Sequence, residues 1–243
     1  MKILALDSSG LVASVAVIED DEMIAEYTVN YKKTHSQTLL PMIDEMAKMI
    51  NLDMATIDAI AVMAGPGSFT GLRIGAASAK GLGLALDKPL IAVPTLEALA
   101  YNLYGVDALI CPLMDARRNQ VYTGIYYFEG TELKTFKDQC AEDIEATIAY
   151  LNKQGRAVIF LGDGVPVYRD VIKEKAQCKY SFAPAHLNRQ RAGALGALAI
   201  IYHEQGKDIS ADEYRPDYLR LSQAERERAE KEKINASSAG DDG

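Results

Sequence analysis

The chain has 243 residues, of which 49% are hydrophobic and 25% charged, and its formal net charge is −8. This composition is typical of a globular protein and excludes low-complexity and collagen-like chains. The acidic balance also excludes a protein that holds nucleic acid by itself, because phosphate contacts require a basic face.

We expect neither a signal peptide nor a membrane-spanning helix in this sequence. The apolar run before Asp7 is too short for a signal peptide, and no apolar stretch approaches the roughly 20 residues that a membrane helix needs. The three cysteines, Cys111, Cys140 and Cys178, have no CxxC spacing. They predict free thiols in a reducing compartment rather than disulfides or a zinc site. We therefore expect a cytoplasmic protein without membrane association.

The first half of the chain predicts three strands, a long helix, a fourth strand, a second helix, a fifth strand and a third helix that begins at Thr95. Apolar runs separated by acidic or glycine-containing turns indicate the strands, and the longer periodic segments indicate the helices. The expected ranges up to the fifth strand are 2–6, 12–19, 22–31, 36–52, 59–64, 70–86 and 89–93.

The second half repeats this order, with Asp115 at the end of its first strand where Asp7 ends the first strand of the other half. Its expected elements are 108–114, 120–128, 131–136, 141–153, 157–162, 166–176, 179–183 and 190–205. Such self-similarity indicates duplication of a βββαβα unit, and hence an α/β fold with two lobes and a cleft between them.

This organisation predicts a first lobe at 1–104, a second lobe at 105–220 and a tail at 221–243. The tail carries mixed charge and nothing that it could bury, so we expect it to be frayed or disordered. The sequence leaves open which lobe the 190–205 helix joins, and what the tail does.

The stretch GPGSFTGLRIGAASAKGLGLAL, residues 65–86, raises the question of a phosphate site. It contains no P-loop, no GxGxxG in the right context and no GxSxG. Anion binding at the helix start is an alternative, since Ser68 or Thr70 would cap that helix and leave free N–H groups nearby. We favour a structural turn.

The helix that follows carries a stripe of small residues. Gly71, Gly75, Ala79 and Gly83 recur every four positions and so share one face, which allows a close approach of two backbones. A helix that is apolar almost all round must be covered on more than one side. Either a neighbouring element of the same lobe or another subunit covers it, and the methionine-rich first helix favours another subunit.

Several segments together resemble one known family. They are ILALDSS, HSQTLLP, GPGSFTGLRIG followed by AKGL, PTLEALA, DARRNQVY, GDG and PDYLR. Over residues 1 to about 220 the chain is similar to the TsaB family, formerly YeaZ, which bacteria need to make threonylcarbamoyladenosine in tRNA.

The resemblance implies a two-lobed ASKHA fold (actin-like ATPase, RNase H-like) that has no catalysis of its own. Family members act as scaffolds that bind the catalytic relative TsaD and work with the ATPase TsaE. The threonylcarbamoyl group is transferred to the adenosine 3′ of the anticodon, and tRNA is contacted only through the complex. ATP and a metal ion are expected on the partners, and no catalytic residue, cofactor or metal ligand is assigned to this chain.

The family binds TsaD through two helices of the first lobe, which fall on 36–50 and 70–86 of this sequence. In isolation the same surface is available for a homodimer. The resemblance leaves open which dimer forms and whether nucleotide lies at the joint. The expected interface residues are Leu39, Met42, Ile43, Met46, Ile50, Gly71, Ile74, Gly75, Ser78, Ala79 and Leu82.

The alternative is an enzyme of the same fold, a small-molecule kinase or ATPase that uses Asp7 and Asp115. In the turn DSSG, Ser8 stands where a glycine would let the backbone approach a phosphate, and in DARRN that turn is filled by Ala116 and two arginines. We therefore expect each aspartate to hydrogen-bond its own turn. The HxxxH metal pair of the catalytic relative is absent, and no Ser–His–Asp or Cys–His arrangement supports a peptidase.

Overall fold

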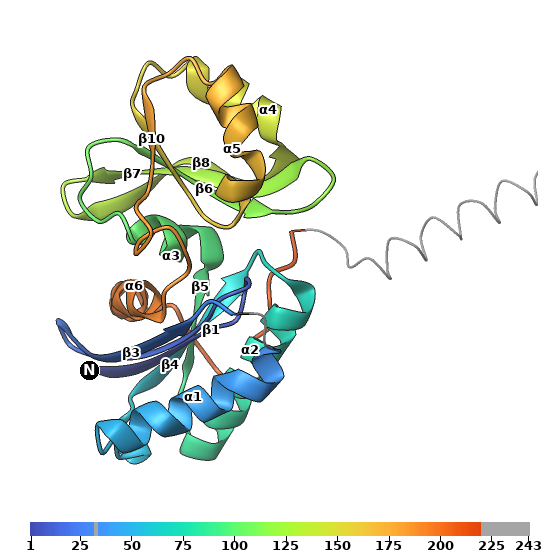
Figure 1. Ribbon diagram of the computed structural model, residues 1–243. Coiled ribbons are helices and arrows are strands. Elements are labelled where there is room, and N and C mark those ends of the chain that lie inside the picture. The colour runs from blue at the N-terminus through green and yellow to red at the C-terminus, as the bar shows by residue number, and fades with distance from the viewer. Residues whose placement is uncertain (32–33, 220–243) are drawn as a thin grey trace, which may run out of the picture.

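The computed structural model describes residues 1–31 and 34–219, which form two lobes one above the other (Figure 1). The tail predicted at 221–243 lies outside the described residues. Each lobe is built on one mixed sheet, and helices cover both sheets. Among the described residues, no helix combines the length and the hydropathy that crossing a bilayer requires.

The first lobe contains a six-stranded sheet in the order β11-β5-β4-β1-β2-β3. Its strands β1, β2 and β3 are antiparallel, while β4 and β5 continue the sheet in parallel with β1. Its elements are β1 (Lys2–Asp7), β2 (Ala13–Glu19), β3 (Glu22–Val29), α1 (His35–Met49), the 3₁₀ turn η1 (Met54–Thr56), β4 (Ala59–Gly65), α2 (Phe69–Leu86), β5 (Leu90–Pro94), α3 (Thr95–Tyr101), α6 (Ala192–Glu204) and β11 (Asp208–Ile209).

The second lobe repeats this topology. Its sheet has the order β10-β9-β6-β7-β8, which is the order β5-β4-β1-β2-β3 of the first lobe with the same parallel and antiparallel pairings. Its elements are β6 (Leu109–Asp115), β7 (Gln120–Glu129), β8 (Glu132–Asp143), α4 (Ile144–Asn152), β9 (Val158–Leu161), α5 (Gly164–Lys175) and β10 (Tyr180–Phe182). The predicted duplication and the two-lobed ASKHA fold are therefore confirmed.

Alternating side chains of β1 divide the first lobe into two hydrophobic cores. Leu4 and Leu6 face α1 and α2, whereas Ile3 and Ala5 face α3 and α6. This alternation is what period-2 strands produce when helices cover both faces of a sheet. The helices α1 and α2 lie side by side on the outer face (Figure 1).

The second sheet is also covered on both faces. One face packs against α4 and α5, and the other packs against Leu96, Leu99 and Leu103 of the α3 segment. Thus α3, which follows directly from the first sheet, lies between the lobes and is buried against the second sheet (Figure 1). Apolar packing along α3 therefore joins the two lobes.

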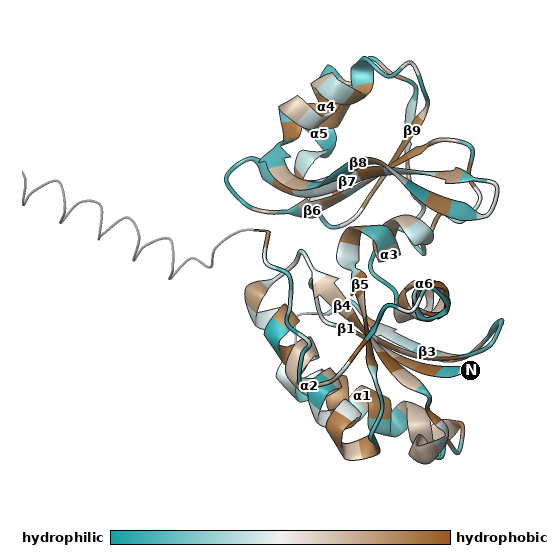
Figure 2. Ribbon diagram, turned by 180° about the vertical axis from the view of Figure 1, so that it is seen from behind, coloured by the Kyte–Doolittle hydropathy of each residue, from teal (hydrophilic) through white to brown (hydrophobic). Residues whose placement is uncertain are grey.

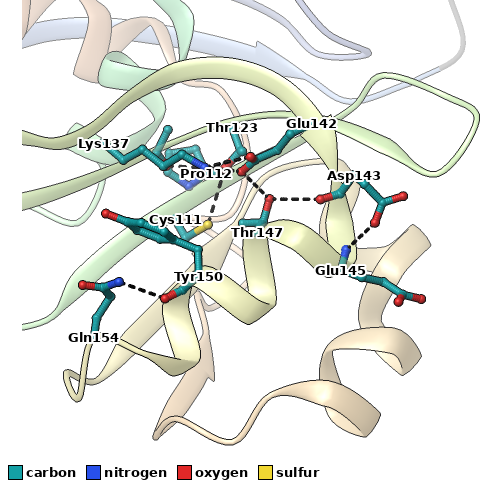
Figure 3. A network of polar contacts seen from close by, with 11 residues as sticks. Cys111, Pro112, Thr123, Lys137, Glu142, Asp143, Glu145, Thr147, Tyr150 and Gln154 are labelled. Atoms are coloured by element: carbon teal, nitrogen blue, oxygen red, sulfur yellow. Dashed lines mark hydrogen bonds and ion pairs between the residues drawn. The ribbon is translucent and has the colours of Figure 1, made fainter.

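The strand β8 is longer than the sequence predicted, and α4 correspondingly begins at Ile144 rather than near 141. A polar network explains the extension (Figure 3). Lys137 and Glu142 of β8 form an ion pair with an N–O distance of 2.6 Å, and the Thr147 hydroxyl of α4 donates to Glu142 at 2.8 Å. These contacts stabilise the last residues of β8 as a strand and attach α4 to it.

The C-terminal part of the described chain returns to the first lobe. Helix α6 packs across β1, β2 and β5, and Asp208 and Ile209 add β11 to the edge of the first sheet. The range 105–220 expected for the second lobe therefore includes a returning segment, which begins at α6. Figure 2 shows α6 as hydrophobic over most of its surface, and its enclosure between the sheet and α3 accounts for that composition.

Candidate functional site

A cleft of about 890 Å³ separates the lobes at the carboxyl ends of β1 and β6. In open α/β sheets, ligand sites form where loops leave the carboxyl ends of strands. Here the cleft is lined from the first lobe by Ser9, Gly10 and the start of α2, and from the second lobe by residues 114–118 and Asp163. Residues 217–219 close one side of it.

Two aspartates end the equivalent strands, in different environments. Asp7 is fully buried, its Oδ1 accepts the Ser9 N–H at 2.7 Å, and its Oδ2 has no partner. Burial raises the pKa of Asp7 from 3.8 to about 6. Asp115 is exposed and accepts the Arg117 N–H at 2.9 Å and the Tyr168 hydroxyl at 3.1 Å. The prediction that each aspartate hydrogen-bonds its own turn is confirmed.

The glycine-rich stretch presses the start of α2 against the turn after β1. A Cβ at Gly67 would lie 2.4 Å from the Ser9 carbonyl oxygen, and one at Gly71 would lie 2.0 Å from the Ser8 carbonyl oxygen. The Ser68 N–H donates to the Ser9 carbonyl at 2.7 Å, and the Ser8 hydroxyl donates to the Gly71 carbonyl at 2.9 Å. The stretch thus makes a close backbone contact within one lobe, which agrees with the predicted structural turn.

Several polar backbone groups of the turn after β1 are therefore already hydrogen-bonded and are not available to a nucleotide. The Ser9 N–H binds Asp7, the Ser9 carbonyl binds Ser68, and the Gly10 carbonyl is 2.8 Å from His35 Nε2. Within the described ranges, no group of three or more histidine, cysteine or acidic side chains is placed to hold a metal ion. The residues present do not fit a magnesium nucleotide held between Asp7 and Asp115.

The turn after β6 has an uncommon backbone. Arg117, Arg118 and Asn119 have φ values of 62°, 55° and 59°, which place all three in the left-handed region. Asparagine tolerates this conformation, but each arginine is held there at a cost of order 1 kcal/mol. The turn brings both arginines to the lining of the cleft.

The predicted interface residues separate into two groups in the structure. Six are buried within the first lobe: Leu39, Ile43, Met46, Gly71, Gly75 and Ala79. The other five remain partly exposed: Met42, Ile50, Ile74, Ser78 and Leu82. The buried six contact the sheet or the turn after β1, so they position the two helices.

The outer face of α2 is a second stripe of small and apolar residues that the sequence analysis missed. Ala77, Gly81 and Ala85 are exposed and follow one another every four positions, and Leu84 beside them is 59% exposed. A Cβ at Gly81 would meet no atom within 4 Å. On α1, Leu40 is also half-exposed. This stripe has the same period as the buried stripe, so spacing alone does not tell which of the two faces outward.

The segment after β11 limits this surface on one side. Lys80 of α2 donates to the Asp212 and Tyr214 carbonyls at 3.2 and 3.3 Å, and the Tyr214 hydroxyl donates to the Met63 carbonyl at 3.2 Å. At the start of α2, the rings of Phe69 and Tyr218 have centroids 4.7 Å apart. Residues 210–219, here named the strap, therefore run along α2 to the cleft.

The comparisons with known proteins agree with this architecture. YeaZ from Pseudomonas aeruginosa has a TM-score of 0.78 and 28% identity, over 90% of this chain and 99% of that chain. The tRNA threonylcarbamoyladenosine biosynthesis protein TsaB of Bacillus subtilis (strain 168) is 34% identical over 236 residues, which are 96% of this chain and 100% of that protein. This chain belongs to the TsaB family.

Two further matches are a second TsaB protein and the model of a transferase family. The TsaB protein of Escherichia coli (strain K12) is 34% identical over 142 residues, 54% of this chain and 61% of that protein. A family model described as TsaD, tRNA N6-adenosine threonylcarbamoyltransferase, matches residues 22–228. The TsaB fold described above thus shares its sequence pattern with the transferase family.

Proposed function

We propose that this chain is a non-catalytic subunit in the cytoplasmic synthesis of tRNA threonylcarbamoyladenosine. In this proposal it binds TsaD through α1 and the outer face of α2, and it works with TsaE. The names of its TsaB relatives support the pathway. ATP and a metal ion are assigned to the partners, and tRNA is contacted through the complex because the chain itself carries a net charge of −8.

The observation that carries the partner surface is the exposed stripe on α2. Ala77, Gly81 and Ala85 would allow another helix to approach closely, and Leu84 supplies apolar area beside them. Contiguous exposed apolar surface on a folded domain is a mark of a protein interface. The partly exposed Met42 and Ile74 extend this area onto both helices.

Two observations on the cleft support a role without catalysis. The turn after β1 is already hydrogen-bonded to α2 and to His35. Among the described residues, no group of three or more histidine, cysteine or acidic side chains is placed to hold a metal ion. In the described part of the chain, the imidazoles of His35 and His203 hydrogen-bond the Gly10 carbonyl and Asp208, with no serine or cysteine among their partners. Neither histidine is arranged to activate a peptidase nucleophile.

The test is co-purification of TsaD with a Gly81→Leu variant. A Cβ at this position would meet no atom within 4 Å and the substitution removes a helical glycine, so we expect leucine to preserve the fold while it holds a partner helix away. We expect loss of TsaD binding, and loss of any homodimer that uses the same face. The matched control is Ala149→Leu on the exposed side of α4 in the other lobe.

Retention of TsaD by folded Gly81→Leu would refute the proposed surface. The variants Gly75→Leu and Ala79→Leu are less suitable, because Gly75 lies against Ser8 and Ala79 is fully buried. The alternative function, a small-molecule kinase or ATPase, predicts ATP hydrolysis by the purified chain that is lost in Asp7→Asn. Turnover of that kind would overturn the non-catalytic role.

A further inference from the structure

A groove of about 340 Å³ lies between α6 and the turn that joins β2 to β3, and it is here named the α6 groove (Figure 1). That turn follows Glu19, which pairs with Lys2 at the start of β1, whereas the cleft lies at the carboxyl end of the same strand. No described residue lines both hollows. The apolar lining of the α6 groove consists of Ile18, Met23, Tyr101, Ala197, Ile200 and Ile201.

The apolar floor of the α6 groove is bordered by a flexible side chain. Met23 of β3 is 49% exposed, and its sulfur would lie 2.7 Å from a Cβ on Gly193 of α6. Ile200 and Ile201 pack against the core of the first lobe and remain partly exposed in the groove. Methionine adapts to neighbours of different shape and is frequent at binding surfaces. The groove can therefore accept an apolar side chain from another molecule.

Three aromatic rings extend this apolar surface beyond the groove. Tyr101 lines the groove, and its ring centroid lies 5.6 Å from that of Tyr104 and 5.9 Å from that of Phe128. Tyr104 is 53% exposed. Exposed apolar patches mark interaction sites, and tyrosine is enriched in protein interfaces. The surface is thus longer than a hollow for one small molecule, which favours a protein segment as its occupant.

The rim of the α6 groove is acidic. Asp20, Asp21 and Glu204 line it, and Asp20 binds the N-terminal ammonium group. No ion pair among the described residues involves Asp21 or Glu204. Glu204 also ends α6, where the helix dipole favours a cation over a carboxylate. Carboxylates without a partner beside an apolar floor are complementary to lysine or arginine.

We propose that the α6 groove is a docking site for a segment of a partner protein that inserts an apolar side chain and carries lysine or arginine beside it. The acidic rim argues against nucleic acid and anionic lipid, because carboxylates repel phosphate groups. A second copy of this chain is disfavoured by its formal net charge of −8. Helix α6 covers the face of the first sheet opposite α1 and α2, so this site is independent of the surface proposed for TsaD.

The experiment is the selection of a displayed library of random 12-residue peptides on the immobilised full chain. We expect the selected peptides to share an apolar residue flanked by lysine or arginine, and their affinity to fall as salt increases. The Asp21→Asn, Glu204→Gln double variant keeps the shape of the rim and should bind a selected peptide at least about fivefold more weakly. The matched control, Asp170→Asn with Glu174→Gln on α5, makes the same charge change outside the groove and should bind as the wild type does.

A second variant tests the apolar floor. Ala197 is partly exposed in the groove, so Ala197→Leu fills part of the hollow with a good helix former and should weaken peptide binding at an unchanged Tm. Ala149→Leu, on the exposed side of α4, is its control. A selection that yields no peptide, peptides without basic residues, or peptides that bind the groove variants and the controls equally would overturn the proposal. Self-association of the chain that is lost in Ala197→Leu would also overturn it, because the groove would then belong to a second copy.

Discussion

The carbonyl oxygen of Ser8 lies 2.0 Å from the position that a Cβ on Gly71 would occupy, and the Ser8 hydroxyl donates to the Gly71 carbonyl at 2.9 Å. The turn after β1 and the first turn of α2 are therefore in direct backbone contact. This contact sets the orientation of α2, and with it the surface proposed to bind TsaD.

The first prediction is that Gly71→Ala strongly destabilises the first lobe. Its methyl group would meet backbone rather than a flexible side chain, so α2 would have to move away from β1. Overpacking of this kind costs about 1–3 kcal/mol or more, beyond the gain in helix propensity. Urea denaturation followed by circular dichroism measures the change. Gly81→Ala on the same helix is the control, and it should stabilise the protein by up to about 1 kcal/mol because its methyl group is unobstructed. Equal effects of the two substitutions would contradict the contact.

The second prediction concerns the stability of Asp7→Asn as a function of pH. Burial raises the pKa of Asp7 from 3.8 in the unfolded chain to about 6 in the folded one. Between these values the folded state holds a proton that the unfolded state releases, so this group makes stability fall as pH rises from about 4 to 6. Asparagine keeps the acceptor for the Ser9 N–H and removes the buried charge. The variant should gain up to about 3 kcal/mol over the wild type at pH 7, as a shift of about two units implies.

Denaturation at a series of pH values tests the origin of that gain. The difference between Asp7→Asn and the wild type should grow from pH 4 to pH 6 and then become constant. Asp115→Asn is the control, because Asp115 ends the equivalent strand but is exposed. A difference for Asp7→Asn that does not vary with pH would show that the carboxylate is not held in a desolvated position.

Much of the fold was predictable from the sequence, because strand and helix periods are local. The matched order of elements around Asp7 and Asp115 indicated the duplication, and the sheet orders confirm it. The position of α6 was not predictable. That helix is apolar all round, so its pattern did not indicate which sheet it covers, and the contacts with β1 and β2 that decide it are distant in sequence.

The candidate site was predictable only in part. Four-residue spacing identified α2 as a helix of close approach, but the buried stripe with Gly71 and the exposed stripe with Gly81 have the same period. Only the three-dimensional contact with Ser8 distinguishes them.

The third prediction concerns the attachment of α6 to the first lobe. Glu26 of β3 is nearly buried, accepts the Gly193 N–H at 2.9 Å, and forms an ion pair with Arg191. Its carboxylate thus lies at the helix N-terminus, where negative charge is favourable. Glu26→Gln keeps the shape and one acceptor but leaves the guanidinium without its anion, and we expect a loss of about 1–3 kcal/mol. Thermal unfolding measures this loss. Glu22→Gln, at an exposed position of the same strand, is the control and should have little effect.

The fourth prediction concerns the strap along α2. Tyr214 is 1% exposed, and its hydroxyl donates to the Met63 carbonyl at the end of β4. Tyr214→Phe keeps the ring and loses this hydrogen bond, which should cost about 1 kcal/mol and lower the Tm by about 2–4 °C for a chain of this size. Hydrogen exchange of the backbone amides in 210–219 should accelerate at the same time, because the strap would be held less firmly. Tyr218→Phe keeps the ring that packs against Phe69 at the end of the strap and should change neither quantity. An unchanged Tm and unchanged exchange in Tyr214→Phe would show that the other contacts of the strap, among them those of Lys80 and Phe69, suffice to hold it in place.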